Sequence, residues 1–264
     1  MLQTRKLSKS YGAAVALREL DLTVGAGEIY CLLGANGAGK TTTINLLLGF
    51  ISPTSGSAHV ADIDVAMAPD AARQRLAYIP ETVMLYGTLT GIENLQYFSR
   101  LSGQRHSDAE LRQFLKRSGL SPDAHDRPLK GYSKGMRQRI KMAQSLVHDP
   151  KVLFLDEPFT GTDPVARRDL MDIVLRLGAE GKSVIVSSHV LHEVQSLTSK
   201  VVLLNHGRLV AEGHVREIRD LIDKHPHHIV LTCDQYRQLA ARMLQWPDVE
   251  GVRVLAGVNG LVVE

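Results

Sequence analysis

The sequence lacks the features that would place it in a membrane or on nucleic acid by itself. None of its 264 residues belongs to an apolar run of about 18 residues, the length that a membrane-spanning helix needs. The N-terminal residues, Met1 to Lys6, lack the apolar stretch of a secretory signal. The 31 basic and 28 acidic residues nearly balance, which argues against a nucleic-acid partner. Any contact with a membrane is therefore expected to run through another protein.

Cysteine and aromatic residues are also scarce. The two cysteines, Cys31 and Cys233, lie far apart, which excludes a disulfide framework and a zinc site built on cysteine pairs. With 44% hydrophobic and 22% charged residues, the composition is otherwise that of an ordinary globular protein. The length suffices for one main domain with a small appendage. We expect a globular chain in a reducing, intracellular compartment.

Short apolar runs alternate with helical segments along most of the chain. Ile29–Leu33 is wholly apolar, which is typical of a buried parallel strand. Similar runs occur at Leu76–Ile79, Val152–Leu155, Val184–Val186 and Val201–Leu204. Leu2–Ser8 and Leu20–Val24 are strand-like stretches at the N-terminus. The pattern predicts an α/β fold with a mainly parallel sheet and an N-terminal antiparallel β portion.

Two regions differ from this alternation. Residues 88–148 show helical periodicity without strands, in Glu93–Leu101, Asp108–Ser118 and Lys134–Val147, which predicts a helical subdomain. We expect the main domain to span residues 1–215. Residues 216–264, which begin with a helix near Val215–Asp223, are expected to form a small α+β appendage. The chain ends directly on a strand-like stretch, so a truncated appendage is one interpretation.

A histidine-rich segment interrupts the appendage. His225, His227 and His228, with Cys233 nearby, could bind a soft metal such as copper. Pro226 and the surrounding composition fit a linker equally well. The ligand spacing is irregular, so both interpretations stay open.

A glycine-rich loop follows the apolar run at Ile29–Leu33. Residues Gly34 to Thr41 fit the pattern G-x-x-x-x-G-K-[ST] between a predicted strand and a predicted helix. Glycines let backbone amides turn toward phosphate oxygens, and the start of the helix adds positive potential. Lys40 supplies a charge at the β- and γ-phosphates, and the Thr41 hydroxyl can bind Mg²⁺. The loop therefore predicts nucleotide binding.

Two adjacent carboxylates end the apolar run at Val152–Leu155. Asp156 and Glu157 lie at the carboxyl end of a predicted strand, where open α/β sheets bind their ligands. Asp156 can hold a metal ion through water, and Glu157 can orient and deprotonate the water that attacks the γ-phosphate. A solvated acidic turn is the other interpretation, which the phosphate loop disfavours.

Over about its first 215 residues the chain resembles the ABC ATPase family. Besides the loop and the carboxylate pair, four family elements occur in the expected order. Tyr11 stands where the family stacks an aromatic ring on adenine. The other three elements are Tyr132-Ser-Lys-Gly-Met136, similar to the signature motif, Thr160-Gly-Thr-Asp-Pro164, similar to the loop that crosses the dimer, and Ser187-Ser-His189, similar to the switch histidine.

Each of these elements also has a local interpretation. Ser133 and Asp163 are good helix N-caps, and Pro164 suits a first helical position. His189 could be a core histidine, and Tyr11 could be surface packing. These alternatives stay open at the level of sequence.

The resemblance implies a complete set of site residues. It assigns catalytic roles to Glu157, His189 and Lys40, and metal binding to Thr41, Asp156 and Glu81. Nucleotide contacts are assigned to Tyr11, Gly34, Asn36, Gly37, Ala38, Gly39, Lys40, Thr41, Thr42, Glu81, Ser133, Gly135 and Asp163. The implied cofactors are ATP and Mg²⁺.

Some residues depart from the commonest family pattern. Glu81 replaces a glutamine, so it can reach Mg²⁺ but cannot donate a hydrogen bond as an amide can. Lys134 and Met136 replace a glycine and a glutamine of the signature, and Thr162 replaces a leucine. Lys134 could approach the nucleotide bound by a second copy or could be a solvated lysine at a helix start. These departures are similar to the ABC-2 exporter branch.

The resemblance also implies partners. We expect a homodimer that hydrolyses ATP and drives a separate transmembrane permease, with ABC-2 export the preferred direction. The chain is then cytoplasmic and peripheral on the inner face of the cell membrane. An ABC ATPase of the cluster-assembly scaffold type is the alternative, and a soluble partner would favour it. The transported substrate is not encoded here.

Overall fold

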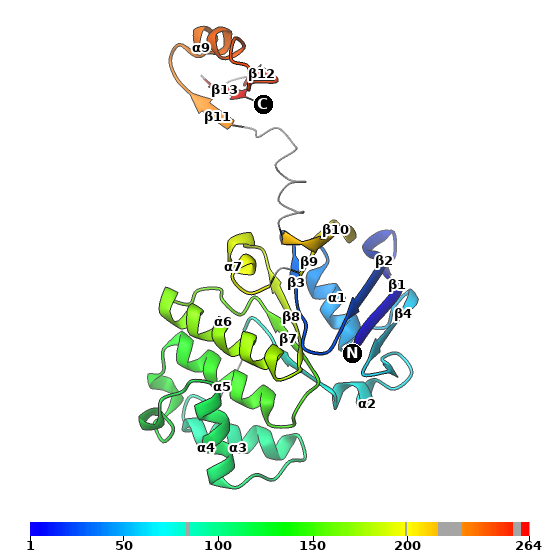
Figure 1. Cartoon of the computed structure of the whole chain (residues 1–264), viewed down its shortest axis with the longest axis vertical. Helices are drawn as coiled ribbons and strands as arrows, with labels where there is room; N and C mark the ends of the chain where they lie inside the picture. The colour runs from blue at the N-terminus through cyan, green and yellow to red at the C-terminus, as the bar shows by residue number, and fades with distance from the viewer. Residues whose placement is uncertain (83–84, 199, 216–228, 256–259, 264) are drawn as a thin grey trace. The chain divides into compact units, whose positions relative to one another are not determined.

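The computed structural model describes residues 1–82, 85–198, 200–215, 229–255 and 260–263 (Figure 1). They fall into two compact units, Met1–His214 and Val215–Glu264. In the described part of the chain, every helix is too short or too polar to cross a lipid bilayer.

The first unit is built on one large sheet. Across the described residues its order is β5-β4-β1-β2-β10-β9-β3-β8-β7-β6. Strands β9, β3, β8, β7 and β6 run parallel to their neighbours in this order, and β1 pairs antiparallel with β2 and β4. The strands are β1 (Leu2–Tyr11), β2 (Ala14–Val24), β3 (Ile29–Leu33), β4 (Ser55–Val60), β5 (Ile63–Asp64), β6 (Leu76–Ile79), β7 (Val152–Asp156), β8 (Ser183–Ser188), β9 (Lys200–Asn205) and β10 (Arg208–His214).

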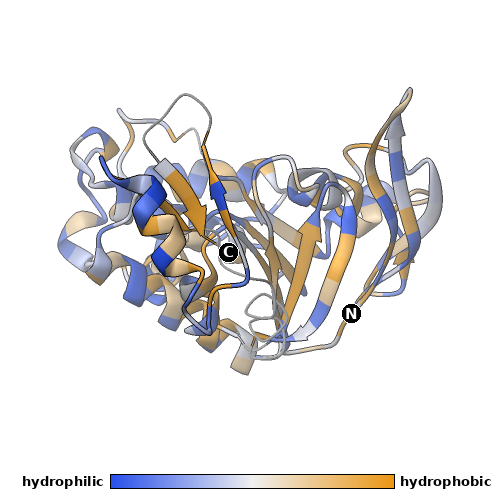
Figure 2. Cartoon of the chain, turned by 90° about the horizontal axis from the view of Figure 1, so that it is seen from above, coloured by the Kyte–Doolittle hydropathy of each residue, from blue (hydrophilic) through white to orange (hydrophobic). Residues whose placement is uncertain are grey.

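Helices cover both faces of the parallel strands, which is why these strands are largely apolar (Figure 2). Alternate residues of a strand point to opposite faces. Phe154 of β7 accordingly packs in one core with α1 (Lys40–Leu47), whereas Leu153 packs in another with α5 (Lys134–Leu146) and α6 (Pro164–Ala179). The expected α/β fold is confirmed.

The helical subdomain consists of α3 (Gly91–Leu101), α4 (Asp108–Arg117) and α5, which pack on one another (Figure 1). Capping boxes start α3 and α4: Thr90 pairs with Glu93, and Ser107 pairs with Glu110. Its core is apolar and includes Leu95, Leu111, Leu115 and Ile140. Shorter elements are α2 (Pro69–Arg73), α7 (Leu191–Gln195) and the 3₁₀ turns Pro122–Ala124 and Leu129–Gly131.

Several strands differ from the sequence expectation. β2 begins at Ala14 rather than at Leu20, because a tight turn with Gly12 at φ 59° lets Tyr11 pair directly with Ala14. β4, β5 and β10 were not predicted from the sequence. β4 (SGSAHV) and β10 (RLVAEGH) carry many polar residues and glycine, so they lack the apolar signal of the buried strands.

The second unit has its own small core. β11 (Ile229–Thr232), β13 (Gly260–Val263) and β12 (Val252–Val254) form an antiparallel sheet in the order β11-β13-β12. Helix α9 (Tyr236–Met243) contributes Met243 to a core with Leu261 and Val263. The α+β character expected for this region is confirmed. Most of the helix predicted near Val215–Asp223, and the three histidines His225, His227 and His228, lie outside the described residues.

Candidate nucleotide site

The phosphate loop joins β3 to α1, and its glycines allow it to lie close to neighbouring backbone. Gly39 is the N-cap of α1 with φ 106°, and Gly37 has φ 80°, conformations that glycine adopts without strain. A Cβ at Gly39 would lie 2.9 Å from the Ala16 carbonyl oxygen, and one at Gly34 would lie 2.6 Å from the Leu204 carbonyl oxygen. Since the first N–H groups of a helix have no partner within the helix, the loop and α1 present free donors for phosphate oxygens.

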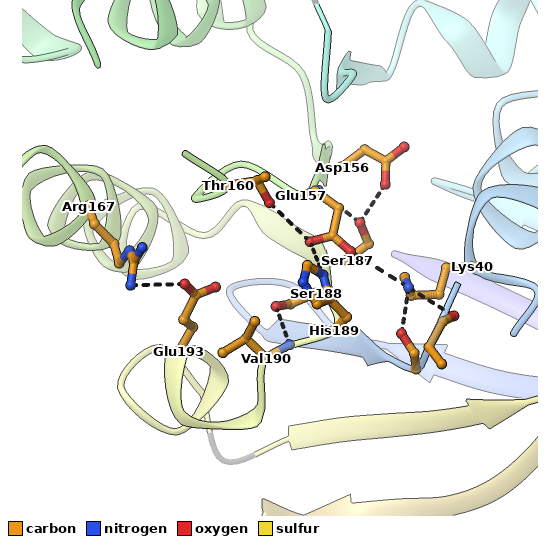
Figure 3. A network of polar contacts seen from close by, with 12 residues as sticks. Lys40, Asp156, Glu157, Thr160, Arg167, Ser187, Ser188, His189, Val190 and Glu193 are labelled. Atoms are coloured by element: carbon orange, nitrogen blue, oxygen red, sulfur yellow. Dashed lines mark hydrogen bonds and ion pairs between the residues drawn. The ribbon is translucent and has the colours of Figure 1, made fainter. Parts of the chain in front are cut away.

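The Lys40 side chain points back over this loop (Figure 3). Only 7% of it is exposed, and its ammonium donates to the carbonyl oxygens of Gly34 at 2.5 Å and Ala35 at 3.3 Å. Lys40 Nζ also lies 3.6 Å from Glu157 Oε1. A positive charge therefore sits between the phosphate loop and the acidic end of β7.

Hydroxyl groups from two neighbouring strands hold the Asp156 carboxylate at the end of β7. Ser187 of β8 donates to Oδ1, and the Tyr78 hydroxyl of β6 donates to Oδ2 at 3.2 Å. Burial, and then the nearby Asp156 charge, raise the pKa of Tyr78, so its hydroxyl stays a donor at neutral pH. Both carboxylate oxygens are thereby fixed in orientation.

Glu157 has an unusual backbone conformation. Its φ of 46° lies in the left-handed region, which costs energy for a residue with a side chain and is frequent at functional sites. The Glu157 N–H donates to Ser187 Oγ at 2.9 Å. The carboxylate is 13% exposed and meets Lys40 through Oε1 and His189 through Oε2. The Thr160 hydroxyl also donates to Oε2, at 3.4 Å.

His189 follows β8 and completes this network (Figure 3). Its Nδ1 lies 3.0 Å from Glu157 Oε2, and half of the side chain is exposed. The interpretation of His189 as a core histidine is therefore wrong. With Nδ1 directed at the carboxylate, Nε2 is the nitrogen left to meet a ligand.

Ser133, Gly135 and Asp163 lie at two helix starts that are close together. Ser133 Oγ accepts from the Met136 N–H at 3.2 Å and caps α5. Asp163 Oδ1 accepts from the N–H groups of Val165 at 3.1 Å and Ala166 at 2.9 Å and caps α6. The two helices touch at Gly135, where a Cβ would lie 2.9 Å from Ala166 Cβ.

These helix starts are separate from the site of Lys40 and Glu157. In the described part of the chain, no hydrogen bond or ion pair links Ser133 or Asp163 to Lys40, Glu157 or His189. Lys134 lies against Gly161 of its own chain, where an added Cβ would come 2.5 Å from its Nζ. Within one chain, the signature residues and the network of Lys40, Glu157 and His189 are therefore two separate groups.

Tyr11 and Glu81 are not part of the hydrogen-bond and ion-pair network described above. Tyr11 is 53% exposed at the end of β1, with Lys9 Nζ 5.0 Å from its ring centroid. Glu81 is exposed beyond the end of β6. Both side chains are open to solvent and to a ligand.

Sequence reasoning missed Tyr78 and Thr160 as members of the site and did not give Ser187 a role of its own. The signal for Tyr78 was a hydroxyl-bearing side chain in a short apolar strand, but only the order β8-β7-β6 shows that its strand adjoins Asp156. Ser187 and Thr160 stood inside the quoted motifs, and their contacts with Asp156 and Glu157 become visible only in three dimensions.

Fold and site together define a phosphate-loop nucleotide triphosphatase: glycine-rich loop, lysine and paired carboxylates converge at the carboxyl ends of neighbouring parallel strands. The family model described as "ABC transporter" matches residues 17–160. The chain belongs to this family, and it is an ATP-binding, ATP-hydrolysing subunit.

Named relatives support this placement. The daunorubicin/doxorubicin resistance ATP-binding protein DrrA of Streptomyces peucetius is 39% identical over 245 residues, covering 92% of this chain and 74% of the relative. The linearmycin resistance ATP-binding protein LnrL of Bacillus subtilis is 34% identical, covering 100% of this chain and 82% of the relative. A solved ATP-binding subunit of an ABC transporter has a TM-score of 0.73 at 31% identity, covering 84% and 93% of the two chains.

Proposed function

We propose that this chain is the nucleotide-binding subunit of an ABC-2 type exporter, in which its ATP hydrolysis drives a separate membrane-spanning partner. The contact of Glu157 with both Lys40 and His189 is the observation that carries the proposal. This contact brings together, at one end of the sheet, the groups that phosphoryl transfer to water requires. The names of DrrA and LnrL, which refer to resistance, support export as the direction.

Each residue of the network then has a defined task. Lys40 and the N–H groups of residues 36–42 bind the phosphates of ATP. Glu157 orients the attacking water and accepts its proton. Through Nδ1, His189 holds the Glu157 carboxylate, and its Nε2 faces the γ-phosphate. The strained backbone of Glu157 keeps its side chain pointed at this position.

An oxygen-only set of ligands suits a magnesium ion. The Thr41 hydroxyl, in the first turn of α1, and the Asp156 carboxylate would hold it, with Glu81 as a third candidate. When bound, the ion neutralises phosphate charge. Ser187 and Tyr78 fix Asp156 for this purpose, so less conformational freedom is lost when the metal site forms.

A second copy of the chain would complete each site. Ser133 and Gly135 lie at the N-terminus of α5, where free N–H groups favour an anion, yet among the described residues no hydrogen bond or ion pair joins them to Lys40 or Glu157. In a dimer they would meet the γ-phosphate bound by the other copy, with Asp163 close to the junction and Tyr11 against the adenine.

The membrane partner would attach beside the helical subdomain. A groove of about 1070 Å³ lies where β6, at one edge of the sheet, meets α3 and α5. A segment of the membrane partner bound there would contact both the subdomain and the sheet. Any movement of the subdomain relative to the sheet would therefore displace that segment. In this proposal the chain lies on the cytoplasmic face of the membrane, held by its partner.

The substitution Glu157→Gln tests this function. We expect ATP binding to be kept, because the amide has the same shape, while phosphate release falls at least about a hundredfold, since the general base is lost. The variant should also accumulate as an ATP-bound dimer in light scattering. Phosphate release at the wild-type rate would remove Glu157 from its assigned role.

A further inference from the structure

Among the residues that the structure describes, Lys141 in the groove beside β6 has a packed side chain and no partner for its ammonium. Lys141 of α5 lines the groove, and only 7% of the residue is exposed. Its ammonium has neither a hydrogen-bond acceptor nor a carboxylate partner among the residues that the structure describes. Burial, and then the charge of Lys134, lower its pKa to about 8. Lys141 is still mainly charged at neutral pH.

An unpaired lysine is costly wherever water is excluded from its ammonium. Desolvating a charge is unfavourable unless an opposite charge or hydrogen bonds compensate for it. Lys141 Nζ is not wholly buried, so the packed stem brings the ammonium to water in the groove. A partner segment that fills the groove would displace this water and would have to supply an opposite charge.

The other charges of the groove do not neutralise Lys141. Arg73 and Arg75 are the other strongly basic residues of the lining, and Asp70 is its single carboxylate in the described part of the chain. The Asp70 side chain is 91% exposed and is paired with Arg73. His148 directs Nε2 at the Leu76 carbonyl oxygen, 3.0 Å away. The groove therefore has an excess of positive charge.

We propose that Lys141 receives a carboxylate side chain from the segment of the membrane partner that occupies this groove. The inference rests on the proposed function and specifies the chemistry of that partner. An aspartate or glutamate of the segment would pair with the ammonium out of contact with bulk water. A partner without it would leave Lys141 unpaired, so the lysine selects among membrane subunits.

Substitution of Lys141 tests the proposal in the assembled complex. The chain is co-expressed with the membrane-spanning protein whose gene adjoins its own, and the dissociation constant is measured in detergent. Lys141→Met keeps most of the side-chain volume and should weaken binding at least about tenfold, because a buried carboxylate loses its partner. Lys116→Met, which removes an exposed lysine of α4, is the matched control and should bind like the wild type.

A labelling experiment on the wild-type chain avoids any effect of substitution on folding. Acetic anhydride at pH 8 should acetylate Lys141 in the free chain and leave it protected in the complex, whereas Lys116 should react in both. ATP turnover by the free Lys141→Met variant should equal that of the wild type.

Two results separate failure of the inference from failure of the proposed function. Equal affinity of Lys141→Met and wild type, or equal acetylation of Lys141 in complex and free chain, overturns the inference alone. If the wild-type chain binds no membrane-spanning protein, the proposed function fails and the inference falls with it.

Discussion

At the scale of single residues, the site depends on contacts among side chains that come from different strands. Glu157 meets Lys40 from the helix after β3 and His189 from the end of β8. The motifs identify these residues by type, because each sits where a strand gives way to a loop. Their mutual distances follow from strand order, which places β3, β8 and β7 side by side.

Tyr78 is a positioning residue for Asp156. In Tyr78→Phe the ring keeps its edge-to-face contact with Phe50, but Asp156 loses a hydrogen-bond donor. Because hydrogen bonds to charged groups contribute about 1.5–3 kcal/mol, we expect the Mg²⁺ concentration for half-maximal ATP hydrolysis to rise about tenfold. ATP binding without Mg²⁺ should not change.

The control for this experiment is Tyr86→Phe, which removes a hydroxyl whose one hydrogen bond among the described residues is to Tyr97 of α3. It should leave the magnesium dependence of the wild type intact. An unaltered magnesium profile in Tyr78→Phe would show that Ser187 alone suffices to orient Asp156.

At the scale of elements, the buried strands and capped helices were predictable, and the polar strands were not. Ile29–Leu33 and Leu76–Ile79 were predicted with the bounds that the structure has, because strands covered on both faces must be apolar throughout. The strand Arg208–His214 carries charged and glycine residues, so its strand conformation depends on its pairing with β9 and, at Arg208, with β2.

Helix capping provides a test that separates structure from function at Ser133. Ser133→Ala and Ser107→Ala each remove an N-cap hydroxyl, from α5 and α4, and each should lower the free energy of unfolding in urea by about 1 kcal/mol. Only Ser133→Ala should also reduce ATP turnover, because only this serine is proposed to meet the nucleotide of a second copy. Equal turnover in both variants would leave Ser133 as an N-cap and nothing more.

At the scale of the whole molecule, the chain is two units with separate cores, and the nucleotide site belongs to the first. Tightly bound ATP must therefore stabilise the first unit against unfolding, since the unfolded chain has no phosphate loop. A ligand at a hundred times its dissociation constant adds about 2.7 kcal/mol. Thermal unfolding of the wild type should shift upward with ATP and Mg²⁺.

The substitution Lys40→Ala should abolish this upward shift, because the phosphates lose the ammonium that lies over the loop. Lys116→Ala, which changes an exposed lysine, should show the full shift. The comparison uses the increment caused by ATP in each variant, so a change in the intrinsic stability of Lys40→Ala does not affect it. A full increment in Lys40→Ala would contradict the role of Lys40.

By itself the sequence determined the chemistry of this protein and its class. Phosphate binding requires a loop of glycines before a lysine, and hydrolysis requires acids at a strand end, so these needs are local and visible as motifs. Only the tertiary structure showed which side chains from distant segments of the chain contact one another. It paired His189 with Glu157, placed Tyr78 beside Asp156, and left Lys141 packed in the groove with no opposite charge at its ammonium among the described residues. Such contacts depend on the order of strands and on helix packing, to which many residues contribute and which no short motif encodes.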